Sequence, residues 1–340
     1  MKRKPKVIEL FAGAGGLALG LEKAGFETVL VSDNDKYSIQ TLKKNRPKWN
    51  ALEIDVRDLS KNKVSSYIKY KKDEIDLLSG GYPCQSFSYA GKKLGLDDIR
   101  GTLFNDFALI LSEVKPKMFL AENVRGLVSH DNGKTLKTMV AVFEKMGYEV
   151  KYQILSAWDY GVAQKRDRVA IIGVRNDIRK KIGEEFNFPK PLKIKPVLKD
   201  ILKNVPKSEH TPYSDVKKNV FKLVPPGGCW RDLPEHIAKS YMGKSFYLGG
   251  GKTGIARRLS WDEPSLTVLC SPAQKQTDRC HPDETRPFTI RENARIQDFP
   301  DSWEFIGPIS QQYKQIGNAV PVGLAFHVAT SIKNYLNKLN

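Results

Sequence analysis

The sequence predicts an α/β protein whose mainly parallel sheet carries its site at one edge. The first supporting observation is the apolar run Val7–Phe11, which leads into the glycine-rich turn 12–16 and then into a helical pattern that Gly25 ends. The second is that later apolar runs alternate with helical patterns, as in parallel sheets whose strands are joined by crossover helices. The third is that these runs stop at glycines or acidic residues, and ligands of open α/β sheets collect at such strand ends.

Length and charge set further limits on the fold and on the partner. A chain of 340 residues exceeds the usual size of a single core, which predicts one large domain and one smaller domain. The formal net charge is +18, from 56 basic and 38 acidic residues, and the natural partner of such a surface is a polyanion. A generally lysine-rich proteome would give the same excess, so charge alone does not decide the partner.

Hydropathy and cysteine usage indicate a soluble, intracellular protein. No window approaches 18 consecutive apolar residues, and the basic start leads directly into a strand without the apolar stretch of a signal peptide. The four cysteines form no CxxC pair, and a chain of this length needs no disulfides. We therefore expect reduced thiols, no membrane segment and no metal site.

The first strand, turn and helix form a cradle for a nucleotide-type cofactor. Glycines allow close approach of the backbone, the helix start offers free N–H groups, and Gly13, Gly15 and Ala18 satisfy the loose dinucleotide fingerprint GxGxxA. A second strand ends near Asp33, where a ribose hydroxyl would be bound, although a turn acid in solvent has the same pattern. A third strand ends near Asp55, which could accept from an adenine amino group. Two acids after the glycine turn favour an adenosine-containing cofactor.

A cysteine follows the end of another apolar run. Residues 75–79 predict a buried strand that stops at two glycines, so Cys84 lies on a stiff Pro-Cys backbone at the mouth of a crevice. A loop cysteine without chemistry fits this spacing equally well. The next strand, 118–121, ends at Glu122 and brings a carboxylate to the same edge. A cysteine and a glutamate that converge on one crevice are a nucleophile and an acid.

Two arginines lie between the next two predicted strands, 148–155 and 169–174. Arg166 and Arg168 are at positions i and i+2 of an extended segment, so their side chains point the same way. Together they can hold a phosphate or a polarised carbonyl group. Ordinary surface charge on a hairpin is the competing interpretation.

The amino-acid composition of the chain changes at about Ile178. Residues 179–285 carry 20 basic and 12 acidic side chains, with prolines, glycines and aromatics between them. Such a region fits a nucleic-acid-reading domain, although a small α+β domain with long loops would look the same. Regular structure returns where Thr289 and Glu292 predict a capping box, and the chain closes with an amphipathic helix over 322–336.

Six motifs, in this order, closely resemble those of the DNA (cytosine-5) methyltransferases of bacterial restriction-modification systems. They are FAGAGG, GYPCQSFS, ENV, QKRDR, RPFTIRENARIQDFP and QIGNAVP, and they span residues 7–322. The resemblance implies a Rossmann-like S-adenosylmethionine-dependent domain with a mixed, mainly parallel seven-stranded sheet, and a smaller target-recognition domain. We expect the catalytic domain over 1–178, the target-recognition domain over 179–305 and a returning C-terminal segment over 306–340.

The resemblance also implies roles for individual residues. Cys84 would add to C6 of a flipped-out cytosine as a thiolate, Glu122 and Arg166 would supply an acid and a cation at N3 and O2, and Arg168 would support them. Asp33 would bind the ribose and Asp55 the adenine amino group of the cofactor. The family usually has a glutamate in place of Asp33, which puts the hydrogen-bond geometry there in doubt. The remaining cofactor-binding positions would be Phe11, Gly13, Gly15, Val56, Leu103, Asn318 and Val320.

The expected activity is methyl transfer from S-adenosylmethionine to C5 of a cytosine in a specific duplex DNA sequence. The expected protein is a cytoplasmic bacterial monomer that protects host DNA, with a possible cognate restriction endonuclease acting on the same site without direct contact. A tRNA cytosine-5 methyltransferase, a dehydrogenase and a catalytically silent DNA-binding regulator are weaker alternatives. The recognition sequence does not follow from the chain, and Arg231, Arg257, Arg258 and Arg279 are candidates for reading bases.

Overall fold

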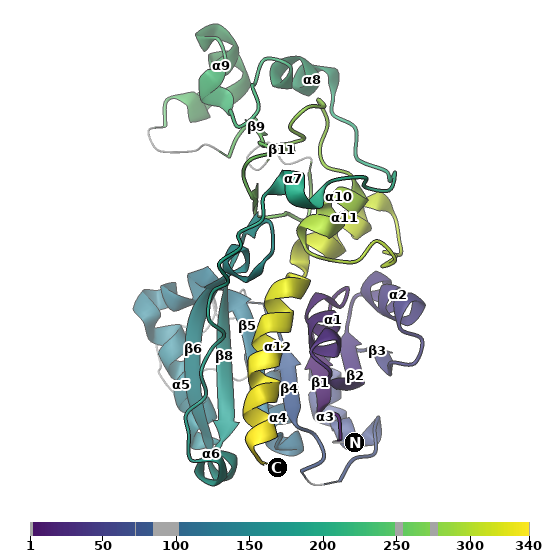
Figure 1. The fold of residues 1–340 in the computed structure, drawn as a ribbon, viewed down its shortest axis with the longest axis vertical. Coiled ribbons are helices and arrows are strands. Elements are labelled where there is room, and N and C mark those ends of the chain that lie inside the picture. Colours follow the sequence, from purple (N-terminus) through teal and green to yellow (C-terminus); the bar gives the residue numbers. More distant parts are fainter. Residues whose placement is uncertain (1–2, 72, 84–101, 249–253, 273–277, 340) are drawn as a thin grey trace.

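The computed structural model describes residues 3–71, 73–83, 102–248, 254–272 and 278–339. Its centre is a seven-stranded sheet with the strand order β3-β2-β1-β4-β5-β8-β6 (Figure 1). The strands are β1 (Lys6–Leu10), β2 (Glu27–Asp33), β3 (Ala51–Glu53), β4 (Leu77–Gly80), β5 (Met118–Val124), β6 (Tyr148–Ser156) and β8 (Asp167–Arg175). The predicted α/β class and the mixed seven-stranded sheet are thereby confirmed.

The sheet is parallel from β3 to β5 and becomes antiparallel at β8. The pairs β3–β2, β2–β1, β1–β4 and β4–β5 are all parallel, whereas β8 runs antiparallel to β5 on one side and to β6 on the other. The carboxyl ends of the five parallel strands therefore meet at one edge. Because β8 enters the sheet from that same edge, its first residues lie beside the end of β5, where Arg168 is opposite Val124.

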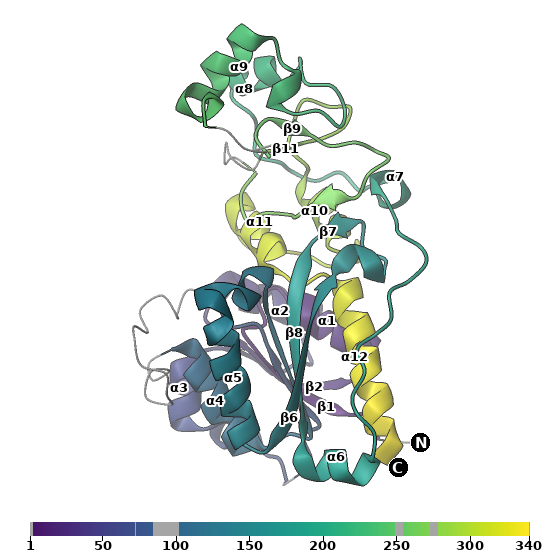
Figure 2. The same cartoon turned by 90° about the vertical axis from the view of Figure 1, so that its left-hand side faces the viewer.

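Helices cover both faces of the sheet (Figure 2). One face packs against α3 (Val56–Asn62), α4 (Leu103–Val114) and α5 (Lys134–Lys145), and the other against α1 (Gly16–Lys23) and α12 (Val322–Leu336). The strands β1, β4 and β5 contribute buried apolar residues to both layers, as central strands of a doubly covered sheet must. Within the described ranges, no helix is long and apolar enough to cross a membrane.

Further elements connect these layers. The helices α2 (Lys36–Asn45) and α6 (Asn176–Ile182) follow β2 and β8. Short 3-10 helices are η1 (Val64–Ser66), η3 (Arg125–Val128), η4 (His130–Gly133), η5 (Ala157–Tyr160), η6 (Trp230–Asp232), η7 (Gly243–Phe246) and η9 (Asn337–Leu339).

A smaller, loop-rich part lies beyond the carboxyl edge of the sheet (Figure 1). It contains α7 (Leu198–Ile201), α8 (Asp215–Phe221), α9 (Glu235–Met242) and the two-residue strands β9 (Arg257–Arg258), β10 (Ser265–Leu266) and β11 (Arg279–Cys280). A separate apolar cluster holds it together, with Phe221, Tyr241 and Cys280 among its members. The strand β10 pairs with β7 (Gln164–Lys165), so this part is joined to the QKRDR segment by backbone hydrogen bonds.

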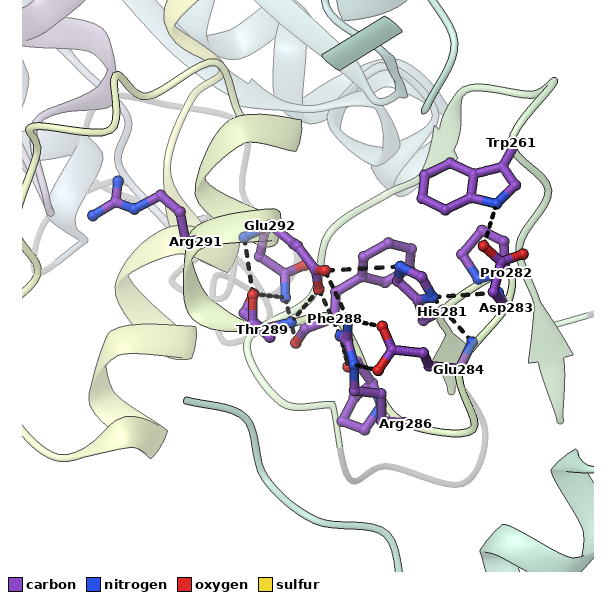
Figure 3. Close-up of polar contacts among 12 residues, drawn as sticks. Trp261, His281, Pro282, Asp283, Glu284, Arg286, Phe288, Thr289, Arg291 and Glu292 are labelled. Atoms are coloured by element: carbon purple, nitrogen blue, oxygen red, sulfur yellow. Dashed lines mark hydrogen bonds and ion pairs between the residues drawn. The ribbon is translucent and has the colours of Figure 1, made fainter. Parts of the chain in front are cut away.

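The helices α10 (Ile290–Ile296) and α11 (Ile309–Asn318) lie between the two parts. The predicted capping box is confirmed, because Thr289 Oγ1 accepts from the Glu292 amide and Glu292 Oε2 accepts from the Thr289 amide. Glu292 also receives the Arg286 guanidinium at 2.7 Å and faces the His281 ring (Figure 3). Trp303, which lies between α10 and α11 in the chain, packs in one cluster with Ile39 and Leu42 of α2, so this stretch packs directly against the part that contains the main sheet.

Candidate active site

A cavity of about 650 Å³ lies at the carboxyl edge of the parallel strands and collects most of the predicted site residues. Of these residues, Gly15 alone among the described ones does not line the cavity; instead it is the left-handed N-cap of α1, at φ 88°. Cys84 lies outside the described residues, but its neighbour Pro83 is part of the wall. The predicted residues that line it are Phe11, Gly13, Asp33, Asp55, Val56, Leu103, Glu122, Arg166, Arg168, Asn318 and Val320.

The glycine turn fixes the geometry of Asp33. The Gly13 amide donates to Asp33 Oδ2 and the Asp35 amide to Asp33 Oδ1, both at 2.8 Å. Burial raises the pKa of Asp33, while these two amides oppose the shift. Phe11, two residues before Gly13, has φ 56°, a left-handed conformation that costs a non-glycine residue about 1–2 kcal/mol. Such strain is typical of functional turns, and here it lets the Phe11 ring line the cavity.

Asp55 provides a second, ionised carboxylate at the neighbouring strand end. It caps α3 by accepting from the Arg57 amide at 2.9 Å, and the Arg57 guanidinium binds both of its oxygens at 3.0 and 2.8 Å. The hydrogen bond from Arg57 lowers the pKa of Asp55. Asp55 therefore stays an acceptor at neutral pH, as binding of an amino group requires.

A third acid in the cavity, Glu9, was not among the predicted site residues. It lies in β1 with 1% of its surface exposed, and its Oε2 has no hydrogen-bond partner among the residues that the structure describes. Burial raises the pKa of Glu9 well above its usual value, a hydrogen bond from the Ala18 backbone opposes this, and nearby Asp33 adds to it. The sequence signal was a single acid inside the otherwise apolar run Val7–Phe11, because isolated buried carboxylates are rare without a function.

Glu122 pairs with Arg168 across the antiparallel junction of β5 and β8. Arg168 Nε lies 2.8 Å from Glu122 Oε1, and each side chain is 15% exposed. Burial raises the pKa of Glu122, and the charges of Arg168 and then Arg166 oppose the shift. At Gly81 a Cβ atom would lie 2.7 Å from Glu122 Oε2, so a larger residue there would displace this carboxyl from its position beside the loop that leads to Cys84.

Arg166 is held differently from its neighbour. It is 2% exposed, and its two Nη atoms donate to the carbonyl oxygens of Val268, Gly317 and Ala319 at 2.7–3.0 Å. Within the described part of the chain, its Nε has no hydrogen-bond partner. Burial and the charge of Arg168 lower the pKa of Arg166. Arg166 thus ties the smaller part and the QIGNAVP segment to the cavity.

The cavity wall at Tyr82, two residues before Cys84 in the sequence, is held by a hydrogen bond and by ring contacts. Asn123 Nδ2 donates to the Tyr82 carbonyl at 2.9 Å, and the buried Tyr82 ring meets Phe11 and Phe104 edge to face. The sequence did not reveal that residues 267–270 and Lys314 also line the cavity. Cys270 is one of these residues, and its thiol donates to Asn318 Oδ1 at 2.9 Å. These residues come from loops and a helix whose positions depend on packing between distant segments.

Comparisons with known proteins give matches over nearly the whole chain. Residues 5–334 match the family model described as C-5 cytosine-specific DNA methylase. The chain is 61% identical over 334 residues to the type II methyltransferase M.Sau96I of Staphylococcus aureus, covering 98% of this chain and 77% of that relative. It is 54% identical over 342 residues to the type II methyltransferase M.Eco47II of Escherichia coli, covering 98% and 80%.

A solved structure gives the same result at the level of the fold. A putative DNA modification methyltransferase encoded within a prophage of Escherichia coli superimposes with a TM-score of 0.71 at 25% identity. The match covers 98% of this chain and 100% of that chain.

Proposed function

The chain belongs to the C-5 cytosine-specific DNA methylase family, and from this premise we propose how its residues carry out methyl transfer to cytosine C5 in DNA. The observation that carries the proposal is one cavity in which carboxylates of the first strands and the Glu122–Arg168 pair face the loop that leads to Cys84. A dehydrogenase would use the glycine turn alone and would leave that pair without a role.

The cofactor in this proposal is S-adenosylmethionine. The end of the cavity at the glycine turn presents the carboxyls of Glu9, Asp33 and Asp55, which suits a cationic cofactor better than a pyrophosphate. Asp33 would bind the ribose, Asp55 the adenine amino group, and Phe11 and Leu103 the faces of the adenine ring. The free Oε2 of Glu9 would face the positively charged methionine end. When bound, the cofactor supplies an electrophilic methyl group on a sulfonium.

The catalytic steps belong to four side chains. The Cys84 thiolate adds to C6 of the cytosine, and Glu122 delivers a proton to N3, so that the electron pair of the C5–C6 bond becomes available at C5 for the methyl group. A base then removes the C5 proton, the C5–C6 double bond forms again as the C6–S bond breaks, the Cys84 thiolate leaves, and N3 returns its proton to Glu122. Since Arg168 contacts Glu122 directly, we assign the cation beside N3 and O2 to Arg168. Arg166 positions the walls around it.

The target base must leave the helix stack before it can enter this cavity, at a cost of a few kcal/mol that contacts to DNA offset. We propose residues 179–305 as the target-recognition part, 1–178 as the catalytic part and 306–340 as the returning segment. The partner is double-stranded DNA, bound by a monomer in the bacterial cytoplasm. The relatives named as type II methyltransferases support a role in protecting host DNA, with an endonuclease of the same target as its counterpart.

The test is methyl transfer by wild-type protein and by Cys84→Ser, with labelled cofactor and with DNA that carries 5-fluorocytosine. We expect the serine variant to lose transfer and keep DNA binding, because a hydroxyl is a far weaker nucleophile than a thiolate at neutral pH. Fluorine at C5 blocks the final proton loss, so wild-type protein should remain attached to the DNA on a denaturing gel. Near wild-type turnover by Cys84→Ser, or the absence of that adduct, would contradict the covalent route.

A further inference from the structure

His281 lies where the smaller part meets α10. It directly follows β11 and is 5% exposed. Its ring packs edge to face against Trp261, which comes soon after β9, with the ring centroids 5.2 Å apart, and it lies 5.5 Å from the ring of Phe288, which precedes α10 (Figure 3). A buried titratable group therefore stands at this junction without a part in the catalytic steps.

The hydrogen bonds of His281 determine which ring nitrogen carries the proton. Its Nδ1 accepts from the backbone amides of Asp283 and Glu284 at 3.2 and 3.1 Å (Figure 3). A backbone N–H can only donate, so Nδ1 is unprotonated and the single proton of the neutral ring is on Nε2. Nε2 lies 3.7 Å from Glu292 Oε1. The neutral ring therefore closes the turn 281–284 through Nδ1 and directs its N–H group at α10.

The carboxylate that faces the ring does not require a charged histidine. Arg286 donates to both oxygens of Glu292, at 2.7 and 2.9 Å, and the Thr289 amide donates to Oε2 at 2.7 Å. Burial raises the pKa of Glu292, but these hydrogen bonds outweigh burial and lower the pKa overall. Burial lowers the pKa of His281, and the charge of Glu292 opposes that shift only in part. The ring is therefore neutral at pH 7 and above.

A proton on Nδ1 is incompatible with this arrangement. It would point at two amide N–H groups that are themselves donors, so the amides of Asp283 and Glu284 would have to move away. The carboxylates of these two residues have other partners, since Asp283 Oδ2 accepts from Trp261 Nε1 and Glu284 accepts from Arg286, all at 2.9 Å. Among the described residues, the charged groups that surround the ring are Glu292 from α10 and Asp283, Glu284 and Arg286 from its own loop. Protonation of the ring therefore opens the turn.

The helix α10 connects this loop to the active-site cavity. Glu292 is the third residue of the helix, so its contact with Nε2 places His281 at the helix start. Just past the other end, Gln297 Nε2 donates to the Ala319 carbonyl at 3.1 Å, and Arg166 donates to the same carbonyl at 3.0 Å. A change at His281 therefore acts on one end of a helix whose other end supports the cavity wall.

The same loop supports a strand of the smaller part. Arg258 of β9 is 4% exposed, and its Nη1 is shared by the carbonyls of His281, Pro282 and Glu284 at 2.9–3.2 Å. Its Nε donates to the Val224 carbonyl at 2.7 Å. Arg258 was a candidate for reading bases, but these contacts place it inside the protein, where it supports the loop. The position of β9 therefore depends on the turn that Nδ1 closes.

We infer that His281 is a positioning residue for the target DNA: its neutral ring fixes the smaller part on α10 in the arrangement that receives the DNA, and protonation of Nδ1 releases this arrangement. The inference rests on the proposed function, because it takes residues 179–305 as the target-recognition part. It concerns binding and not chemistry, since the ring contacts the turn, Trp261, Phe288 and α10, none of which is assigned a catalytic step.

The pH dependence of this effect has a definite sign. The folded protein favours the neutral ring, so the contribution of the ring is present above the ordinary histidine pKa of about 6.5 and is lost as the pH falls toward and through the lowered pKa. Release takes up one proton, so the apparent affinity for DNA changes at most about tenfold per pH unit. The KM for DNA should therefore rise in acid, whereas the effect of pH on kcat should not depend on the ring.

The experiment first maps the methylated site by bisulfite sequencing of DNA from a host that expresses the wild-type protein. The KM for a duplex with that site and kcat are then measured from about pH 5.5 to 8 for the wild type, His281→Asn and His281→Leu. Asparagine Oδ1 takes the position of Nδ1 and can accept from the two amides without binding a proton, whereas leucine fills the space without an acceptor. His236→Asn is the matched control, because His236 is an exposed histidine of α9 in the same part.

We expect the wild-type KM for DNA to rise by about 3- to 10-fold per pH unit below about pH 6.5. His281→Asn should match the wild-type KM within about twofold at pH 8 and keep that value in acid, because its acceptor does not titrate. His281→Leu should show a KM raised by about tenfold at every pH, since it leaves two buried amides without their acceptor. The pH profile of kcat should be the same in all four proteins, and His236→Asn should follow the wild type in KM as well.

Three results would overturn the inference. An equal rise of KM in acid for the wild type and His281→Asn would assign the pH dependence to other groups. A KM raised about tenfold in His281→Asn at pH 8 would show that the acceptor at Nδ1 is not what positions the DNA. Melting temperatures that fall in the His281 variants while KM stays at the wild-type level would leave the ring a role in stability alone. A wild type that methylates no cytosine would instead contradict the proposed function.

Discussion

At the level of single residues, the acid and the cation of the active site are set by burial and by one ion pair. Glu122 would be an ordinary ionised carboxylate in water, but burial at the edge of the sheet raises its pKa through desolvation, and the charge of Arg168 opposes that shift. A protonated Glu122 can donate to N3 of cytosine, whereas an ionised one would repel that atom. The nearby Arg168 keeps the shift limited, so the group can release and regain its proton during the reaction.

This arrangement predicts a pH dependence. Because the pKa of Glu122 is raised and its protonated form is the active one, turnover should decline as the pH rises through that pKa. Glu122→Gln should lower kcat by about 100- to 10,000-fold and remove that decline, since an amide cannot transfer a proton. Single-turnover rates across pH for both proteins provide the measurement. An unchanged profile, or a glutamine variant near the wild-type rate, would show that Glu122 is not the acid.

At the level of elements, several helices and strand ends could be predicted from the sequence because residues close together in the chain determine them. The capping box of α10, the helix over 322–336 and the strand ends at the cavity all appear where the sequence placed them. The start of α5 at Lys134 was not among the predictions, and no sequence pattern signals the left-handed conformations of Asp131 and Asn132 that precede it. The helix α11 was likewise missed, since its buried residues are chosen by contacts with Phe288 and α2.

The site shows the same division between local and distant effects. Asp33, Asp55 and Glu122 were found because the apolar runs predicted as strands stop at or near them, although β2 includes Asp33 and β5 continues through Val124. The clamp made by Arg166 was not foreseeable, because its acceptors are carbonyls of Val268 and Gly317, more than 100 residues away in the chain. Glu9 was missed because it lies inside a strand and not at its end.

One close approach between elements can be tested directly. A Cβ atom on Gly16 would lie 2.2 Å from the Val320 carbonyl oxygen. The start of α1 and the segment after α11 can therefore lie this close together because residue 16 has no side chain. Gly16→Ala should lower the free energy of unfolding by about 1–3 kcal/mol and weaken cofactor binding, since Val320 lines the cavity. Gly126→Ala is the control, because no atom lies within 4 Å of its added Cβ. Denaturant unfolding and cofactor titration provide the readouts, and equal behaviour of both variants would refute the steric account.

At the level of the whole molecule, the cavity is shared between parts of the chain that are far apart in sequence. The β1–β5 edge supplies the carboxylates, residues 267–270 supply one wall, and α11 with the residues after it closes another. The net charge of +18 draws both parts toward DNA without selecting a sequence. We therefore propose that selection comes from the smaller part, in which α8 and α9 lie beyond the sheet edge (Figure 1).

This separation predicts that target choice can be exchanged without loss of chemistry. Replacing residues 179–285 by the corresponding segment of a methyltransferase with another target should redirect methylation to that target, because Cys84, Glu122 and Arg168 lie outside the exchanged segment. The junctions should preserve the pairing of β10 with β7 and the Arg166 contact to the carbonyl at position 268, since both join the smaller part to the wall of the cavity. Bisulfite sequencing of host DNA identifies the modified sites of the chimaera. An active chimaera that still methylates the original target would place recognition outside 179–285, and the catalytic edge of the sheet would then have to read the bases itself.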